Sequence, residues 1–228
     1  MSRRCGLAAA ACLLAACSTP YHGGTNSDPL DQQAPHLKQE EIRTDLIRQM
    51  LDKGEYYAAL ANIEDQKRGG GSDELTLLEA DARRHLGQLT QADTLYRRLF
   101  ATRYAAEAYH GLGLLYTTAD LDTAIASLRF AVKRAPTNVD FRNDLGYALM
   151  EAGRYTEAMP ELSTAAELAP DQSKSRNNLI ILMILMGDET AVRRLAQESA
   201  VTPDRMQVLR DSAKSIRDKQ LARAAKAG

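Results

Sequence analysis

Three cysteines and four histidines are the residues of this chain best suited to act as nucleophiles or metal ligands. A metal site needs several such side chains at defined spacing. The sequence contains no His-x3-His pair, no cysteine pair and no carboxylate cluster with metal-ligand spacing. Two histidines lie near the N-terminus and two lie in separate helical segments: His22, His36, His85 and His110. The sequence therefore predicts no metal site and no cofactor.

A catalytic nucleophile is not predicted either. A serine nucleophile of one common kind lies in a G-x-S-x-G turn, which this sequence lacks. The glycine run 69–71 does not have the residue order of a phosphate-binding loop, so we interpret it as a turn. We therefore expect no catalytic residue and no small-molecule substrate. The alternative, an accessory enzyme subunit with a concealed active site, is disfavoured because no His, Cys or carboxylate set converges.

Charge and composition bear on other classes of function. The chain has 29 basic and 30 acidic residues, a net charge of −1, so no global field attracts nucleic acid or anionic lipid. Alanine and leucine are abundant and rank at the top of helix propensity. The composition therefore favours a helical protein that does not bind nucleic acid.

Cys17 stands in a pattern with a defined chemistry. A basic start is followed by a short apolar run that ends in Leu14-Ala15-Ala16-Cys17. The run is too short to span a membrane, which takes about 20 apolar residues, and it is typical of an export signal. The last four residues resemble the lipobox of bacterial lipoproteins. The resemblance implies that residues 1–16 are a removable signal peptide and that Cys17 is acylated, so that its lipid holds the protein on a membrane.

The residues after Cys17 bear on location. Ser18 resembles the default signal for transfer to the outer membrane, whereas an aspartate there would resemble a signal for inner-membrane retention. Residues 17–38 combine prolines and glycines with polar side chains and lack helical periodicity, so we predict a flexible tether. The expected location is the outer membrane, facing the periplasm. The alternative is a secreted protein with a fortuitous cysteine near its cleavage site.

From residue 39 onward the sequence repeats itself. The clearest equivalent pairs are 34 positions apart: Ala124 and Ala158, Leu128 and Leu162, Pro136 and Pro170. Small residues such as Gly113 and Gly146 allow paired helices to approach closely, and leucines fill the seam between them. The prolines mark the start of each next repeat, since proline cannot continue a helix. One repeat cannot bury its apolar face alone, so we expect the copies to stack.

The order of these residues resembles the tetratricopeptide repeat (TPR), although leucine replaces the aromatic of its second helix. The resemblance implies an all-α fold, a TPR-like solenoid of about five helical hairpins over 39–203 with a C-terminal capping helix over 204–228. The hairpins are expected at 40–68, 73–103, 105–135, 139–169 and 173–201. We interpret the amphipathic final helix as a solubilising cap, with docking to a partner as the alternative.

In TPR arrays the first helix of each hairpin lines a concave groove. The groove residues that this implies are His110, Leu114, Asn143, Tyr147, Asn177, Asn178 and Ile181. An asparagine amide can both donate and accept a hydrogen bond, so the asparagines could hold the backbone of an extended peptide. In the alternative interpretation they are solvated or cap helices, and Tyr147 belongs to the core.

A longer stretch carries a closer resemblance. The segment Asn143–Leu149, followed by Gly153-Arg154-Tyr155 and later by Asn177-Asn178-Leu179, is similar to the TadD family of lipoproteins from tight-adherence (Flp) pilus systems. The resemblance implies a membrane-anchored scaffold that helps to assemble the outer-membrane secretin and the pilus, with other assembly proteins as partners. An alternative with the same fold is an outer-membrane adaptor that recruits peptidoglycan or envelope-assembly enzymes.

Overall fold

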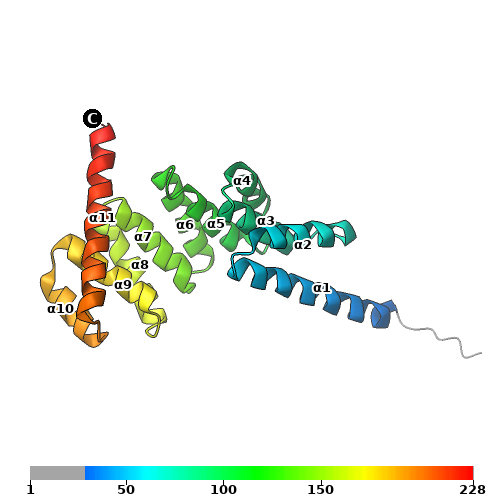
Figure 1. Cartoon of the computed structure of the whole chain (residues 1–228), viewed down its shortest axis with the longest axis horizontal. Coiled ribbons are helices and arrows are strands. Elements are labelled where there is room, and N and C mark those ends of the chain that lie inside the picture. Colours follow the sequence, from blue (N-terminus) through cyan, green and yellow to red (C-terminus); the bar gives the residue numbers. More distant parts are fainter. Residues whose placement is uncertain (1–28, 228) are drawn as a thin grey trace, which may run out of the picture. The chain divides into compact units, whose positions relative to one another are not determined.

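The computed structural model describes residues 29–227, and side chains from 39 to 225, as helices joined by short turns (Figure 1). This range holds eleven helices and no strand, which confirms the predicted all-α fold. The chain divides into two compact units, residues 1–39 and residues 40–228. The second unit holds the part of α1 from residue 40 onward and all the later helices.

Ten of the helices are paired in five successive hairpins. Their bounds are α1 (Pro29–Asp52) and α2 (Tyr56–Gly69), α3 (Asp73–His85) and α4 (Leu89–Arg98), α5 (Ala105–Tyr116) and α6 (Leu121–Arg134), α7 (Val139–Glu151) and α8 (Tyr155–Leu168), and α9 (Ser173–Met186) and α10 (Glu189–Glu198), followed by α11 (Pro203–Ala227). Short polar side chains begin several of them. Asp120 accepts a hydrogen bond from the Thr123 amide at 3.0 Å, and Asn138 accepts one from the Phe141 amide at 3.0 Å.

The first helix is longer than the sequence suggested. It begins at Pro29, inside the segment 17–38 that we predicted to be a tether. Proline suits the first position of a helix, because the backbone N–H group that proline lacks would have no partner within the helix there. The leucine, glutamine and alanine residues that follow are good helix formers, although they show no apolar stripe. Residues 17–28, and Cys17 with them, lie outside the described residues.

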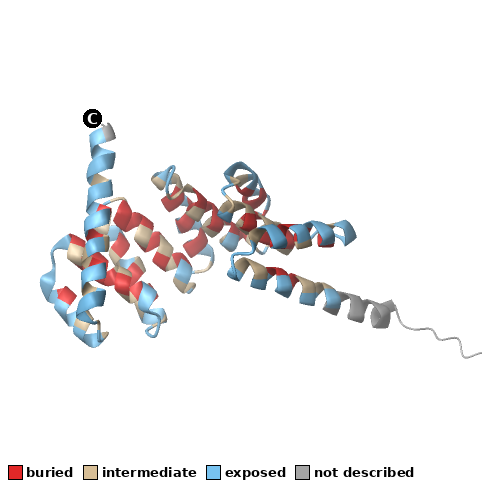
Figure 2. Ribbon diagram, in the orientation of Figure 1, coloured by how far each residue is buried: buried red, intermediate tan, exposed pale blue. Residues whose placement is uncertain are grey.

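The helices of one hairpin approach each other closely at two glycines. A Cβ atom built on Gly113 would lie 2.5 Å from Leu128 Cγ, and one on Gly146 would lie 2.5 Å from Leu162 Cγ. Each leucine is fully buried. The second helix of each hairpin then packs on the first helix of the next, so that buried residues lie on the facing sides of neighbouring helices (Figure 2). Stacking therefore builds the core, as expected for repeats.

The final helix covers the last hairpin. Thr202 accepts a hydrogen bond from the Arg205 amide at 3.3 Å and caps the start of α11. Leu209, Ala213 and Ile216 form a buried stripe along α11 and join the core cluster of α7 and α9. The helix contacts both α9 and α7, so it extends beyond the hairpin that it caps.

Candidate protein-binding groove

Two hollows adjoin along the first helices of the hairpins. One, of about 410 Å³, is lined by residues of α1, α3 and α5. The other, of about 450 Å³, is lined by α7, α11 and the C-terminal end of α5 with the turn after it. Leu114 lines both hollows, so they form one continuous surface, which we call the inner groove. Apart from α11, every helix that lines it is the first of its hairpin.

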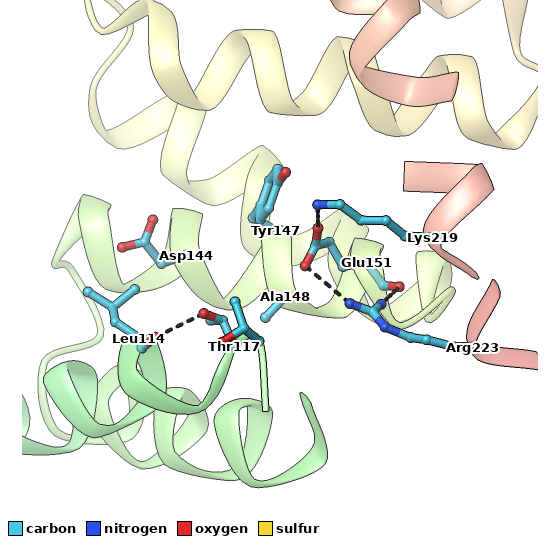
Figure 3. A pocket seen from close by; sticks show the side chains of 9 residues that line it. Leu114, Thr117, Asp144, Tyr147, Ala148, Glu151, Lys219 and Arg223 are labelled. Carbon is cyan, nitrogen blue, oxygen red and sulfur yellow. Dashed lines mark hydrogen bonds and ion pairs between the residues drawn. The ribbon is translucent and has the colours of Figure 1, made fainter. Parts of the chain in front are cut away.

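Three of the predicted groove residues line this surface. His110 lines the hollow of α1, α3 and α5, Tyr147 lines the hollow of α5, α7 and α11, and Leu114 lies between them. Tyr147 is half-buried and stands over the second hollow (Figure 3). Burial raises the pKa of Tyr147, and the nearby charge of Glu151 raises it further, so the phenol stays neutral and can donate a hydrogen bond.

The predicted asparagines and isoleucine are placed differently. Asn143, Asn177 and Ile181 are buried, with Asn143 only 1% exposed. Half-buried Asn178 donates to Asn143 Oδ1 at 2.9 Å, and Asn143 donates to Asp144 Oδ1 at 3.1 Å. The next hairpin packs directly over these positions, so the Asn143–Asn178 pair joins α7 to α9. This corrects the expectation that the asparagines offer free amides to a peptide.

Asp144 is the centre of a polar cluster that the sequence interpretation missed. His110 Nε2 donates to Asp144 Oδ2 at 2.8 Å, and Lys174 Nζ donates to Asp144 Oδ1 at 3.0 Å. The His110 ring is also stacked on Phe141 at 4.4 Å. Burial alone would raise the pKa of Asp144, but the hydrogen bonds and charges of His110 and Lys174 outweigh it and hold the pKa below the usual value. The cluster thus joins α5, α7 and α9 through one ionised carboxylate.

The pKa of Asp144 predicts a dependence of stability on pH. A carboxyl group whose pKa is lower in the folded state stabilises the fold above its unfolded-state pKa, and this contribution is lost as the pH falls through the folded-state pKa. Between about pH 5 and pH 3, the unfolding free energy of the wild type should fall more steeply than that of Asp144→Asn. Urea unfolding at each pH measures this, with exposed Asp171→Asn as the control. Equal slopes for wild type and Asp144→Asn would show that Asp144 does not contribute.

A second cluster closes the other end of the groove. Lys219 Nζ donates to Glu151 Oε1 at 2.8 Å, Arg223 donates to the Glu151 carbonyl at 2.9 Å, and Gln220 donates to the Met150 carbonyl at 2.8 Å. The hydrogen bond and charge of Glu151 raise the pKa of Lys219. The last carbonyls of a helix lack intrahelical partners and attract cations. The three side chains of α11 therefore bind the C-terminal end of α7, and Figure 3 shows two of them, Lys219 and Arg223, directed at Glu151.

The lining of the groove combines apolar and charged side chains. An apolar floor that includes Leu51, Leu78 and Leu114 is flanked by charged side chains such as Arg48 and Asp81. Over the described part of the chain, no group of three or more His, Cys, Asp or Glu residues could hold a metal ion. In the same residues, no helix combines the length and apolar character that crossing a membrane requires.

The hairpins and their repeat period define the class of protein. Residues 115–196, from the end of α5 to α10, match the family model described as tetratricopeptide repeat. The structure has the stacked hairpins of such repeats over the described residues. The described part of the chain is therefore a helical-repeat solenoid that is similar to TPR proteins.

A curated relative and solved structures agree with this class. The chain is 36% identical over 163 residues to the TPR repeat-containing protein PA4299 of Pseudomonas aeruginosa, and the match spans 70% of this chain and 64% of that protein. The thermophilic TPR protein TTC0263 of Thermus thermophilus matches with a TM-score of 0.60 and 21% identity, over 78% of this chain and 98% of that one. MamA from Desulfovibrio magneticus RS-1 matches with a TM-score of 0.58 and 17% identity, over 71% and 93%. These two structures support the fold alone.

Proposed function

We propose that this protein is a lipid-anchored, non-enzymatic scaffold of the outer membrane that binds a protein partner in the inner groove. The TPR fold suggests a protein–protein interaction scaffold. The observation that carries the proposal is the pair of adjoining hollows with an apolar floor and charged edges. Concave surfaces with apolar linings and a few placed polar groups are suited to binding.

The proposed role of the scaffold is assembly of the secretin and pilus of a tight-adherence system. Two features of the sequence support it: the lipobox resemblance ending at Cys17, and the resemblance of the segments around Asn143–Leu149 and Asn177-Asn178-Leu179 to TadD lipoproteins. The lipid places the groove beside the membrane in which a secretin assembles. A partner concentrated on the same membrane meets the groove more often, since confinement raises its effective concentration.

A Leu114→Arg variant tests the binding surface. Leu114 lines both hollows, so arginine would put bulk and charge on the apolar floor of the groove. Loss of one apolar contact of this size weakens binding by about tenfold to a hundredfold. Cells with the variant should therefore show fewer secretin multimers and fewer surface pili, with normal amounts of the lipoprotein.

The matched control is Leu168→Arg, which adds the same charge at an exposed position of α8 and should leave piliation unchanged. Normal secretin assembly with Leu114→Arg would contradict the proposed use of the groove. Co-purification from membranes separates the alternatives, because enzymes of peptidoglycan or envelope assembly, in place of the secretin, would favour the adaptor function.

A further inference from the structure

The final helix consists of two parts that are held in different ways. Its first part is anchored by the buried side chains of Leu209, Ala213 and Ile216. Beyond Ile216, no residue from 217 to 225 is buried, and Leu221 is 64% exposed. The distal part, residues 217–225, is therefore held by polar contacts. Lys219, Gln220 and Arg223 contact the end of α7, and Gln220 Oε1 also accepts a hydrogen bond at 2.9 Å from the Tyr155 hydroxyl at the start of α8.

The end of α7 has the properties of a cation-binding site. The Glu151 side chain is only 9% exposed, whereas the side chains of Lys219 and Arg223 are 53% and 43% exposed. The Glu151 carboxylate thus lies deep in the wall of the hollow, and Lys219 and Arg223 reach it from the solvent-exposed edge of the hollow. Lys219 and Arg223 are four residues apart, so they lie on one face of the helix and reach Glu151 together.

We propose that the end of α7 and the adjoining hollow form a docking site for a basic helical segment of a partner protein, and that the distal part of α11 occupies this site in the free protein. The partner segment would carry two cations four residues apart, as α11 does. This inference rests on the proposed function, because it names the kind of partner that the inner groove accepts.

Two properties of the contact make it replaceable. The side chains of Lys219 and Arg223 are about half exposed, so water screens their attraction to Glu151. The distal part also has no apolar anchor, so it can detach while the stripe from Leu209 to Ile216 stays docked. A segment that is weakly held opens locally without unfolding of the rest. A partner helix with the same charges and an apolar residue directed at Leu114 or Tyr147 would gain contacts in the hollow that α11 leaves unfilled.

The test uses the full chain with Lys219→Ala and Arg223→Ala, called the released variant. The probe is a fluorescent peptide of residues 212–225, kept helical by a lactam between Lys214 and Asp218, which are both exposed. We expect the released variant to bind the peptide at least about tenfold more tightly than the wild type, whose site is occupied. A peptide in which both cations are replaced by glutamate should bind the released variant at least about tenfold more weakly.

Variants of the acceptor complete the test. Adding Glu151→Gln to the released variant should lower peptide affinity about tenfold, whereas adding Glu161→Gln, whose partner is Arg142, should leave it unchanged. Adding Glu151→Lys should reverse the preference in favour of the glutamate peptide, which loss of folding could not do. Circular dichroism checks that each variant is folded.

Hydrogen exchange gives a second measurement without a peptide. In the released variant, amides of 217–225 should exchange at least about tenfold faster than in the wild type, while those of 205–216 stay protected. The proposal is overturned if exchange of 217–225 is unchanged, or if the released variant does not distinguish the two peptides. These measurements are made without membrane, secretin or cells, so their failure is distinguishable from failure of the proposed scaffold function.

Discussion

A Leu162→Ala variant is expected to lose about 2–5 kcal/mol of unfolding free energy. Leu162 is fully buried, and its Cγ would lie 2.5 Å from a Cβ built on Gly146, so its side chain occupies the space left by the glycine. Truncation removes apolar contacts and leaves a cavity in the seam between α7 and α8. Urea unfolding followed by circular dichroism measures the loss, with Leu168→Ala, at an exposed site of the same helix, as the control.

The double variant Gly146→Ala with Leu162→Ala tests the seam itself. Gly146→Ala alone should lower the unfolding free energy by about 1–3 kcal/mol, because the added methyl group overpacks the seam. The higher helix propensity of alanine offsets part of this loss. Once Leu162 is truncated, the added methyl group has room, so the double variant should be more stable than the sum of the single changes predicts. Gly113→Ala with Leu162→Ala should be additive, since Gly113 faces Leu128 instead. Additivity in both pairs would mean that Gly146 and Leu162 do not share a seam.

The fold could be predicted because its determinants repeat along the chain. The pairs Leu128 and Leu162 or Pro136 and Pro170 recur at 34 residues, and each recurrence marks the same place in a hairpin. Each copy can be compared with the others, and the predicted starts of the last four hairpins, at residues 73, 105, 139 and 173, are also the first residues of α3, α5, α7 and α9. The start of α1 was not predictable in this way. It lies before the first repeat and has no equivalent with which to compare it.

The site was harder to predict because a helix face does not reveal how much of it the next hairpin covers. Asn143 and Leu114 lie on first helices of successive hairpins, yet Asn143 is buried against Asn178 whereas Leu114 remains at a hollow. The Asp144 cluster did leave a signal, since Asp144 follows His110 by 34 residues, one repeat period. The contact of α11 with Glu151 left no such signal in the sequence, because α11 lies outside the repeats and Lys219 has no equivalent residue in an earlier hairpin.

The anchor prediction has the largest expected effect in the cell. In Cys17→Ser, the thiol that would carry the lipid is replaced by a hydroxyl, which does not form the thiolate nucleophile. Stable anchoring takes more than one acyl chain, and the variant would lack the chains attached through the Cys17 thiol. The membrane-bound fraction of the processed protein should therefore fall by on the order of a hundredfold. The variant should either appear in the soluble periplasm or keep residues 1–16, and it should not incorporate labelled palmitate.

Cell fractionation, mass spectrometry and palmitate labelling measure these outcomes, with Ser18→Ala as the control that keeps the thiol. A Cys17→Ser protein that is cleaved normally and remains on the outer membrane would show that Leu14-Ala15-Ala16-Cys17 is not a lipobox.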